Sequence, residues 1–186
     1  MSTFTIIAGV NGVGKSSLMG PLKGERHDIG VIVDVNAISA KCGGNIKGGK
    51  KAIQMINDCL DKKINFTQET TLSGKRIFAT LEKAKEKGYY IRMYYVALSS
   101  LNESYIRIEN RVKKGGHNIP KDDVAKRFKK RFDDVIKVLP YCDEVHFYDN
   151  ENGFIDVGEY KNGEIVIKQH TEWIEQLKIE FSYEQV

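Results

Sequence analysis

The sequence predicts an α/β fold in which helices cover both faces of a doubly wound, mostly parallel sheet. Short apolar runs alternate along the chain with segments of helical periodicity, which is the pattern of β-α-β units. The first two runs, residues 4–9 and 30–34, contain almost no polar side chain, as is typical of strands buried on both faces. A glycine-rich loop ending in Lys15-Ser16 joins the first run to a helical segment.

The remaining elements follow from the same two periodicities. Strands are expected at residues 65–70, 89–98 and 144–149; the first of these has a weak pattern and is expected mainly because the alternation requires it. Residues 152–182 predict a hairpin that turns at Asn162-Gly163, followed by a helix around residues 173–179. Apolar residues at helical spacing predict three helices. The first contains Ile53, Ile56 and Leu60, and the second contains Ile77, Leu81 and Ala84. The third is longer and contains Val124, Phe128, Phe132 and Val135. We expect residues 1–186 to form a single domain with a helical lid at residues 107–131 and a small C-terminal hairpin and helix.

Composition excludes several classes of protein. Hydrophobic residues make up 41% of the 186-residue chain and charged residues 29%, which excludes global disorder. No apolar run approaches the roughly 18 residues needed to cross a membrane, and the N-terminus lacks the pattern of a signal peptide. Cys42, Cys59 and Cys142 lack metal-ligand spacing, which favours reduced thiols. We therefore expect a cytoplasmic protein with no membrane partner.

Positive charge is concentrated in one segment. Residues 107–131 contain ten Lys or Arg and three Asp or Glu, a net charge of +7 in a chain whose total is +4. Such a patch indicates either an anionic ligand or a solvated helix face, and charge alone does not separate a nucleic acid from a nucleotide.

The segment GVNGVGKSS, residues 9–17, fits the phosphate-binding pattern G-x-x-x-x-G-K-[ST]. Its glycines let successive backbone N–H groups face phosphate oxygens, Lys15 reaches the β- and γ-phosphates, and the Ser16 hydroxyl ligates Mg²⁺. The pattern follows a buried strand and opens a helix, so it assigns the sheet to the P-loop NTPase and kinase type rather than to the dinucleotide-binding type. The residues expected to bind the nucleotide are Gly9, Asn11, Gly12, Val13, Gly14, Lys15, Ser16 and Ser17.

Polar residues also follow the other expected strands. Because the carboxyl ends of parallel strands meet at one edge of a sheet, these residues are expected close to the nucleotide. A polar residue after a single strand is common and indicates little. The prediction of a site rests on finding polar residues after all of these strands. The residues are Asp34 and Asn36, then Glu69-Thr70-Thr71, then Ser99-Ser100, and finally Asp149-Asn150.

Five segments resemble, in order and spacing, the zeta-toxin-like P-loop kinases. They are GVNGVGKSS, ETTLSG (69–74), RVKKGGHNIP (111–120), VAKRFKKRF (124–132) and YDN (148–150), and the resemblance covers residues 4–150. It implies a kinase that transfers the γ-phosphate of ATP or GTP, with Mg²⁺, to a hydroxyl of a small-molecule acceptor. The best-known members phosphorylate UDP-N-acetylglucosamine and pair with a small antitoxin, so the resemblance also implies a nucleotide sugar as acceptor and an antitoxin as partner.

The resemblance also assigns roles by position. Lys15 and Ser16 match the phosphate and Mg²⁺ residues of the family. Glu69, Thr70 and Thr71 match the segment that helps to hold the acceptor.

Three arginines of the basic segment, Arg111, Arg127 and Arg131, occupy lid positions where the family places arginines over the transferring phosphate. Phosphoryl transfer spreads negative charge over the equatorial oxygens, and arginines that close over them stabilise that charge. Arg127 and Arg131 are four residues apart and are expected on one helix face. A solvated basic face is the alternative for each single arginine. His117 is expected to contact the lid or the substrate rather than to act as a base.

The sequence departs from the family after the second strand. Relatives usually carry Asn-x-Asp or Asp-x-Asp there, and the second acid accepts the proton of the substrate hydroxyl. In this chain the second position is Asn36, which accepts no proton at a useful pH, and Asp34 holds the first. Either Asp34 serves as the base, or the base is missing and the protein binds nucleotide with weak or altered transfer. Because positioning and electrostatics dominate phosphoryl transfer, we expect an active enzyme in which Asp34 is catalytic and both residues contact the acceptor.

Two other functions remain open on the sequence alone. A regulatory ATPase or a motor on nucleic acid would suit the basic segment, and residues 31–34 imitate a Walker B strand. These residues follow the P-loop closely, however, and no Glu stands beside Asp34 to activate water, so nucleic acid is not expected as a partner. A nucleotide-binding protein without catalysis would suit Asn36.

Overall fold

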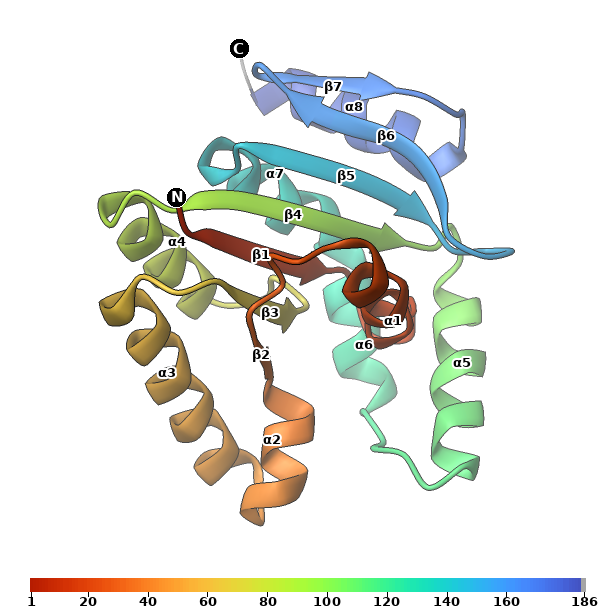
Figure 1. Ribbon diagram of the computed structural model, residues 1–186. Helices are drawn as coiled ribbons and strands as arrows, with labels where there is room; N and C mark the ends of the chain where they lie inside the picture. Colours follow the sequence, from red (N-terminus) through yellow and green to blue (C-terminus); the bar gives the residue numbers. More distant parts are fainter. Residues whose placement is uncertain (185–186) are drawn as a thin grey trace.

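The computed structural model describes residues 1–184, which form a seven-stranded sheet in the order β2-β3-β1-β4-β5-β6-β7 (Figure 1). Strands β1 to β5 pair in parallel, whereas β6 and β7 continue the sheet in antiparallel fashion. The mostly parallel sheet is therefore confirmed, and the weakly patterned run at residues 65–70 does form a strand. The strands are β1 Thr3–Ala8, β2 Val31–Asp34, β3 Phe66–Thr70, β4 Tyr90–Ala97, β5 Glu144–Asp149, β6 Ile155–Lys161 and β7 Glu164–Ile167.

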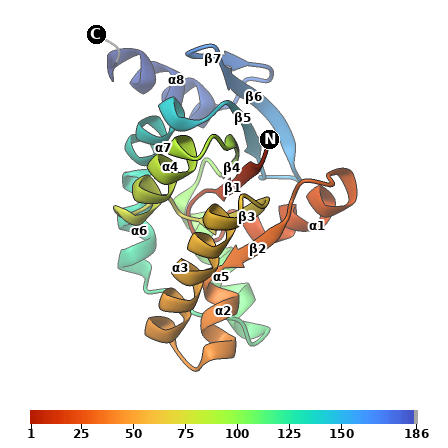
Figure 2. The same ribbon diagram turned by 60° about the vertical axis from the view of Figure 1, so that its left-hand side comes forward.

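Helices connect the strands and cover both faces of the sheet (Figure 2). Helix α1 lies on one face, and α3, α4, α7 and α8 lie on the other. Among residues 1–184, no helix is both long enough and apolar enough to span a membrane. The helices are α1 Lys15–Glu25, α2 Val35–Cys42, α3 Asn45–Lys62, α4 Arg76–Glu86, α5 Leu101–Lys113, α6 Lys121–Lys129, α7 Arg131–Val138, the 3-10 helix η1 Leu139–Tyr141, and α8 Glu172–Glu184.

The predicted C-terminal hairpin is confirmed. Strands β6 and β7 pair in antiparallel fashion and turn at Asn162-Gly163. Both turn residues have positive φ, 55° and 82° respectively, which is the conformation that matches the right-handed twist of the two strands. The helix expected around residues 173–179 is the longer α8.

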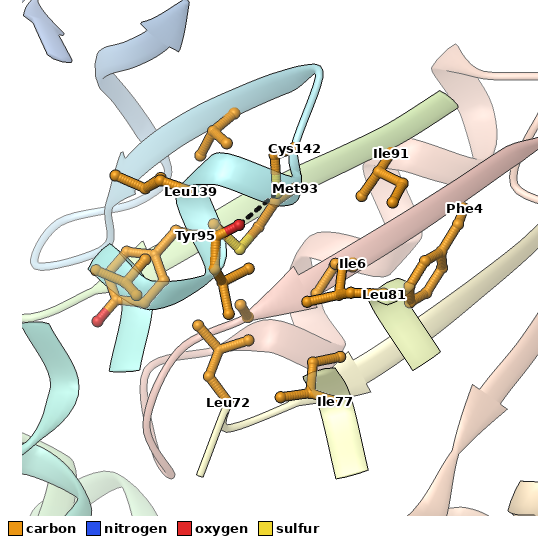
Figure 3. Close-up of a cluster of buried hydrophobic side chains, with 14 of the residues drawn as sticks. Phe4, Ile6, Leu72, Ile77, Leu81, Ile91, Met93, Tyr95, Leu139 and Cys142 are labelled. Atoms are coloured by element: carbon orange, nitrogen blue, oxygen red, sulfur yellow. Dashed lines mark hydrogen bonds between the residues drawn. The ribbon is translucent and has the colours of Figure 1, made fainter. Parts of the chain in front are cut away.

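Two apolar clusters hold the layers together. The larger cluster fills the space between the sheet and helices α3, α4, α7 and α8, and Figure 3 shows its centre, where Met93 and Tyr95 of β4 meet Leu139. Cys142 lies in the same cluster, and burial raises the pKa of its thiol to about 12. All three cysteines are free thiols, as the sequence predicts. The smaller cluster lies between α1 and the opposite face of the sheet.

The prediction of one longer helix from Val124 to Val135 is wrong, because the chain breaks at Lys130 between α6 and α7. Lys130 has φ −92° and ψ 3°, outside the regular helical values. The two halves bury their apolar residues against different partners. Val124 of α6 packs with Ile108 of α5 in a small separate cluster, whereas Val135 of α7 packs in the main core. A continuous helix could not follow both surfaces.

A buried hydrogen bond ties α8 to the end of β5. The indole Nε1 of Trp173 donates to Asp149 Oδ2 at 2.8 Å, and the two side chains are 1% and 5% exposed. The other carboxylate oxygen of Asp149 accepts from the backbone N–H of Glu151 at 2.9 Å. Asp149 therefore orients the turn after β5 while it anchors the C-terminal helix.

Replacing Trp173 by Phe keeps an aromatic ring in the core but leaves a buried Asp149 oxygen without its donor. We expect the free energy of unfolding to fall by about 2 kcal/mol, because a buried carboxylate that loses a hydrogen bond keeps its desolvation penalty. Urea denaturation followed by circular dichroism measures this change, since the chain has one tryptophan and the variant has none to fluoresce. The control is Tyr183→Phe at an exposed position of α8, for which we expect a change below about 0.5 kcal/mol. Equal denaturation midpoints for the two variants would contradict the role of the hydrogen bond.

Candidate active site

A cavity of about 720 Å³ opens at the carboxyl ends of the central strands, between the P-loop (residues 9–17) and helices α5 and α6. It brings together most of the site residues predicted from the sequence. Predicted residues that line it are Asn11, Gly12, Gly14, Lys15, Ser16, Ser17, Asn36, Glu69, Thr70, Thr71, Arg111, Arg127 and Asn150. Within the described chain, the predicted residues that do not line it are Gly9, Val13, Asp34, Ser99, Ser100, His117, Arg131 and Asp149.

Close backbone packing sets the shape of the P-loop. Gly9 has φ 139°, and a Cβ atom there would collide with the carbonyl oxygen of Val96 on β4. Gly14 has φ 100°, and a Cβ atom there would collide with the amide nitrogen of Asn150. That amide, Nδ2 of Asn150, donates to the carbonyl oxygen of Val13 at 2.8 Å. Gly9 and Val13 therefore shape the loop from outside the cavity, and Asn150 fixes it to the end of β5.

Lys15 is the first residue of α1 and is only 7% exposed. Its Nζ atom donates to the carbonyl oxygen of Val10 at 2.9 Å, so the ammonium group is held at the floor of the cavity. The pKa of Lys15 is lowered to about 8, mainly by burial and to a smaller extent by nearby Arg111, while the Glu69 carboxylate acts in the opposite direction. An anionic ligand in the cavity would favour the charged form of this lysine.

Ser16, next to Lys15, and Glu69 form a hydrogen-bonded pair of oxygen-bearing side chains. The Ser16 hydroxyl donates to Glu69 Oε2 at 2.9 Å. The pair forms because β3 lies next to β1 in the sheet, with Glu69 in register with Ile7 just before the P-loop. Burial raises the pKa of Glu69, and the Lys15 ammonium opposes that change.

This pair fits a magnesium ion, because a hydroxyl and a carboxylate are hard oxygen donors. Among residues 1–184, no group of three or more His, Cys, Asp or Glu side chains is placed to hold a metal ion. Mg²⁺ keeps most of its remaining ligands as water and substrate phosphate oxygens, so two protein oxygens are sufficient. The sequence assigned Glu69 to the acceptor and did not predict its contact with Ser16.

Asp34 ends β2 and caps the next helix. Its Oδ1 atom accepts hydrogen bonds from the backbone N–H groups of Asn36 at 2.9 Å and Ala37 at 3.2 Å, the usual geometry of a helix N-cap. The Asp34 carboxylate is close enough to favour the charged form of Lys15. Asn36 and Val35, in the first turn of α2, line the cavity itself.

Two of the predicted arginines face the cavity from different helices. Arg127 of α6 donates from Nη1 to the Oδ1 atom of Asn11 in the P-loop at 2.6 Å. Arg111 of α5 lines the cavity and donates from Nη2 to the carbonyl oxygen of His117 at 2.7 Å. Both guanidinium groups thus line the same cavity as the P-loop.

Arg131 and the side chain of His117 lie apart from this group. The Arg131 guanidinium carbon is 3.8 Å from the ring centroid of Phe128 and 4.1 Å from that of Phe132, and Nη1 donates to the Phe128 carbonyl at 2.8 Å. The break at Lys130 removes the shared helix face that the spacing of Arg127 and Arg131 predicted. The side chain of His117 is exposed, and its carbonyl oxygen accepts the hydrogen bond from Arg111.

Several cavity residues were not predicted as site residues. Helix α5 contributes Arg107 and Asn110 in addition to Arg111, and Lys114 follows the last residue of this helix. The spacing of three and four residues places the helical members on one face. Arg107 is held by Glu103 Oε1 at 2.7 Å and by a backbone carbonyl at 3.2 Å. The helical spacing could have identified this set, whereas Gln68 of β3, which also lines the cavity, has no such signal.

Comparisons with known proteins identify a family and a fold. The family model for zeta toxin matches residues 48–156, more than half of the chain. An uncharacterized protein of Haemophilus influenzae is 32% identical over 126 residues, which cover 64% of this chain and 88% of that protein.

Two solved structures share the fold at low sequence identity. A chain in the crystal structure of AvrRxo1-ORF1:-ORF2 with ATP is 15% identical, with a TM-score of 0.73 over 96% of this chain and 64% of that chain. A chain of the PezAT chromosomal toxin-antitoxin system of Streptococcus pneumoniae is 15% identical, with a TM-score of 0.66 over 100% of this chain and 85% of that chain. The present chain thus spans less than two thirds of the length of the first neighbour, and the likeness concerns the fold.

Proposed function

Since this chain belongs to the zeta toxin family, we propose that it is a phosphotransferase that moves the γ-phosphate of ATP or GTP to a hydroxyl of a small molecule. The observation that carries the proposal is one cavity that is lined both by Lys15 and Ser16 of the P-loop and by Arg111 and Arg127 of α5 and α6. Several cations around one cavity suit phosphoryl transfer, because they stabilise the negative charge that develops on the transferred group.

On the donor side, the P-loop would hold the triphosphate. The Lys15 ammonium would contact the terminal phosphates, and Ser16 with Glu69 would hold Mg²⁺. When bound, the ion neutralises phosphate charge and orients the terminal group for in-line transfer. Arg127, already in contact with Asn11 of the P-loop, would close over the γ-phosphate as part of a lid formed by α5 and α6.

The transfer itself forms one bond and breaks one. The acceptor oxygen bonds to the γ-phosphorus as the bond from that phosphorus to the bridging oxygen breaks, and the bond electrons leave with the nucleoside diphosphate. We assign the proton of the acceptor hydroxyl to Asp34. Both cap hydrogen bonds of Asp34 use Oδ1, so Oδ2 is available among the described residues. Asn36 and Thr71 would then position the acceptor.

Family membership supports a nucleotide sugar such as UDP-N-acetylglucosamine as the first acceptor to test. It also supports a small antitoxin as partner, in line with neighbouring structures that describe a toxin-antitoxin system and a two-protein complex. We place the protein in the cytoplasm, where nucleotide sugars and ATP are available.

A second candidate function is nucleotide binding without transfer. One observation favours it: the polar residue of the Asp34 to Asn36 segment that lines the cavity is the amide, and the acid of this segment caps a helix. The analysis of reaction products separates this candidate from the kinase.

We expect ATP turnover to depend on a small-molecule acceptor. The protein is incubated with Mg-ATP and either UDP-N-acetylglucosamine or a protein-free metabolite extract, and mass spectrometry identifies species that gain one phosphate. Lys15→Ala is the control and should abolish the product, because the triphosphate loses its buried cation. Turnover stimulated by DNA or RNA alone would contradict the kinase, and nucleotide binding with no phosphorylated species would leave the second candidate.

Asp34→Asn should separate the two roles of this residue. The amide oxygen still accepts the cap hydrogen bonds, so the free energy of unfolding should remain within about 0.5 kcal/mol of the parent value. We expect kcat to fall roughly 10² to 10⁴-fold, the usual range for loss of a general base. Asn36→Asp should leave kcat unchanged or raise it.

The matched variant Asp34→Ala removes the cap as well as the charge. It should lose about 1 kcal/mol of stability in addition to the same loss of kcat. Stability is read from urea denaturation and kcat from product formation. Turnover near the parent value in Asp34→Asn would eliminate Asp34 as the base.

Nucleotide affinity should fall at alkaline pH. Burial lowers the pKa of Lys15 to about 8, so the free protein loses this charge as pH rises through that value. Bound phosphate favours the protonated lysine, and we expect the Kd for Mg-ATP to be roughly tenfold higher at pH 9 than at pH 7.5. Isothermal titration calorimetry measures this change. Lys15→Arg is the control, because a guanidinium stays charged over the whole range; a parent Kd that is flat in pH would contradict the assignment.

A further inference from the structure

The outer turn of the P-loop touches both lid helices. The Asn11 side chain is only 6% exposed, and its Oδ1 atom accepts a hydrogen bond at 2.6 Å from Nη1 of Arg127 on α6. At the next residue, a Cβ atom on Gly12 would collide with the carbonyl oxygen of Ser104 on α5. Asn11 is thus a buried acceptor that joins the P-loop to a helix 116 residues away in the sequence.

The contact with Asn11 gives the Arg127 side chain a direction that its own helix does not supply. Helix α6 has nine residues, and its buried residue, Val124, packs with α5 in the small cluster rather than against the sheet. The chain then breaks at Lys130, directly after α6. An arginine side chain has several rotatable bonds, and ordering it costs conformational entropy. The hydrogen bond to the P-loop orders Arg127 before a ligand binds, which reduces the cost of binding.

Two arginines of the cavity are held by acceptors of different charge. Arg127 is held by the neutral amide of Asn11. Arg107 is held by the carboxylate of Glu103 at 2.7 Å, which compensates its charge. A neutral acceptor directs a guanidinium and leaves its positive charge to act on a ligand, whereas a carboxylate offsets that charge. Arg127 is therefore the better placed of the two to stabilise an anion.

Arg127 acts at the phosphate end of the cavity. Burial is the main cause of the lowered pKa of Lys15, and the charge of Arg127 contributes to it. Lys15 is the residue expected to contact the terminal phosphates, so Arg127 lies within electrostatic range of the same groups. A guanidinium has five N–H donors, and the contact with Asn11 uses one of them. Other donors of Arg127 remain for phosphate oxygens while this contact is kept.

We propose that Asn11 is a positioning residue for phosphoryl transfer, which directs Arg127 to the γ-phosphate through a neutral hydrogen bond and leaves the arginine its full charge. The proposal rests on the proposed kinase function, because the charge that Arg127 would stabilise develops on the transferred group. Asn11 itself forms and breaks no bond in the transfer. A contact that only held the lid in place would be at least as strong with a carboxylate at position 11, since charge-assisted hydrogen bonds are the stronger ones.

Two variants separate the direction of the arginine from its charge. Among residues 1–184, Asn11 is not one of the non-glycine residues with positive φ, so other side chains fit its backbone. Asn11→Asp keeps an acceptor for Arg127 but offsets its charge. We expect the rate of product formation at saturating Mg-ATP to fall at least about thirtyfold, with a urea denaturation midpoint at or above the parent value. Asn11→Ala removes the acceptor, and we expect a loss of about fivefold, the factor that one neutral hydrogen bond supports.

A double-mutant cycle tests whether Asn11 acts through the arginine. In an Arg127→Ala background, Asn11→Ala should change the rate and the Kd for Mg-ATP less than about 1.5-fold, because no guanidinium remains to be directed. A fivefold loss in that background would overturn the proposal. Lys129→Ala is the matched control for Asn11→Asp, because it lowers the net charge by the same amount at an exposed position of α6. It should leave the rate within about twofold of the parent value, since exposed charges are screened.

Nucleotide affinity distinguishes failure of this proposal from failure of the kinase function. Isothermal titration calorimetry gives the Kd for Mg-ATP and for Mg-ADP, which lacks the γ-phosphate. We expect Asn11→Asp to weaken Mg-ATP binding at least about tenfold and Mg-ADP binding less than about threefold. Equal losses for the two nucleotides, or a parent-like rate in Asn11→Asp, would overturn the role of Asn11 and leave the kinase intact. If the parent forms no phosphorylated product, the kinase function fails and the role of Asn11 in transfer fails with it, even where the loss of affinity is confined to Mg-ATP.

Discussion

The contact between the P-loop backbone and the ends of β4 and β5 positions the P-loop side of the cavity. Gly9 runs so close to the carbonyl of Val96 that no side chain fits there, and Gly14 lies against the amide of Asn150. Since Asn150 also binds the carbonyl of Val13, the loop is fixed by a strand end that is remote in sequence. Lys15 begins its helix directly after this fixed turn, so the sheet itself sets the place of the ammonium group.

Lys15 and Glu69, the charged residues next to that turn, lie in surroundings that disfavour their charged forms, and a bound ligand can offset this cost in free energy. Burial lowers the pKa of Lys15 and raises the pKa of Glu69, so the charged form of each is disfavoured by the surroundings. A phosphate next to the lysine and a divalent cation next to the carboxylate would reverse both effects. Groups whose pKa values are shifted in opposite senses in one cleft are typical of functional sites.

Much of the architecture was predictable because it follows from local pattern. Apolar runs identified the parallel strands, and the glycine pattern identified the P-loop, since both depend on residues adjacent in the chain. The face shared by Arg127 and Arg131 was not predictable, because helical spacing holds only while one helix continues and the chain breaks at Lys130. The contact of Ser16 with Glu69 was also missed, because it depends on β3 lying beside β1, and strand order is not encoded in either segment.

Because the helix breaks at Lys130, Arg127 and Arg131 have different roles. Arg131 stacks on Phe128 of α6 and on Phe132 of α7, so it stabilises the junction between the two helices. Arg127 projects from the far side of that joint to the P-loop. During evolution the two positions would therefore be constrained by different demands. Position 127 must place a positive charge at the P-loop. Position 131 must supply a planar group that packs between two aromatic rings, and a lysine has no such group.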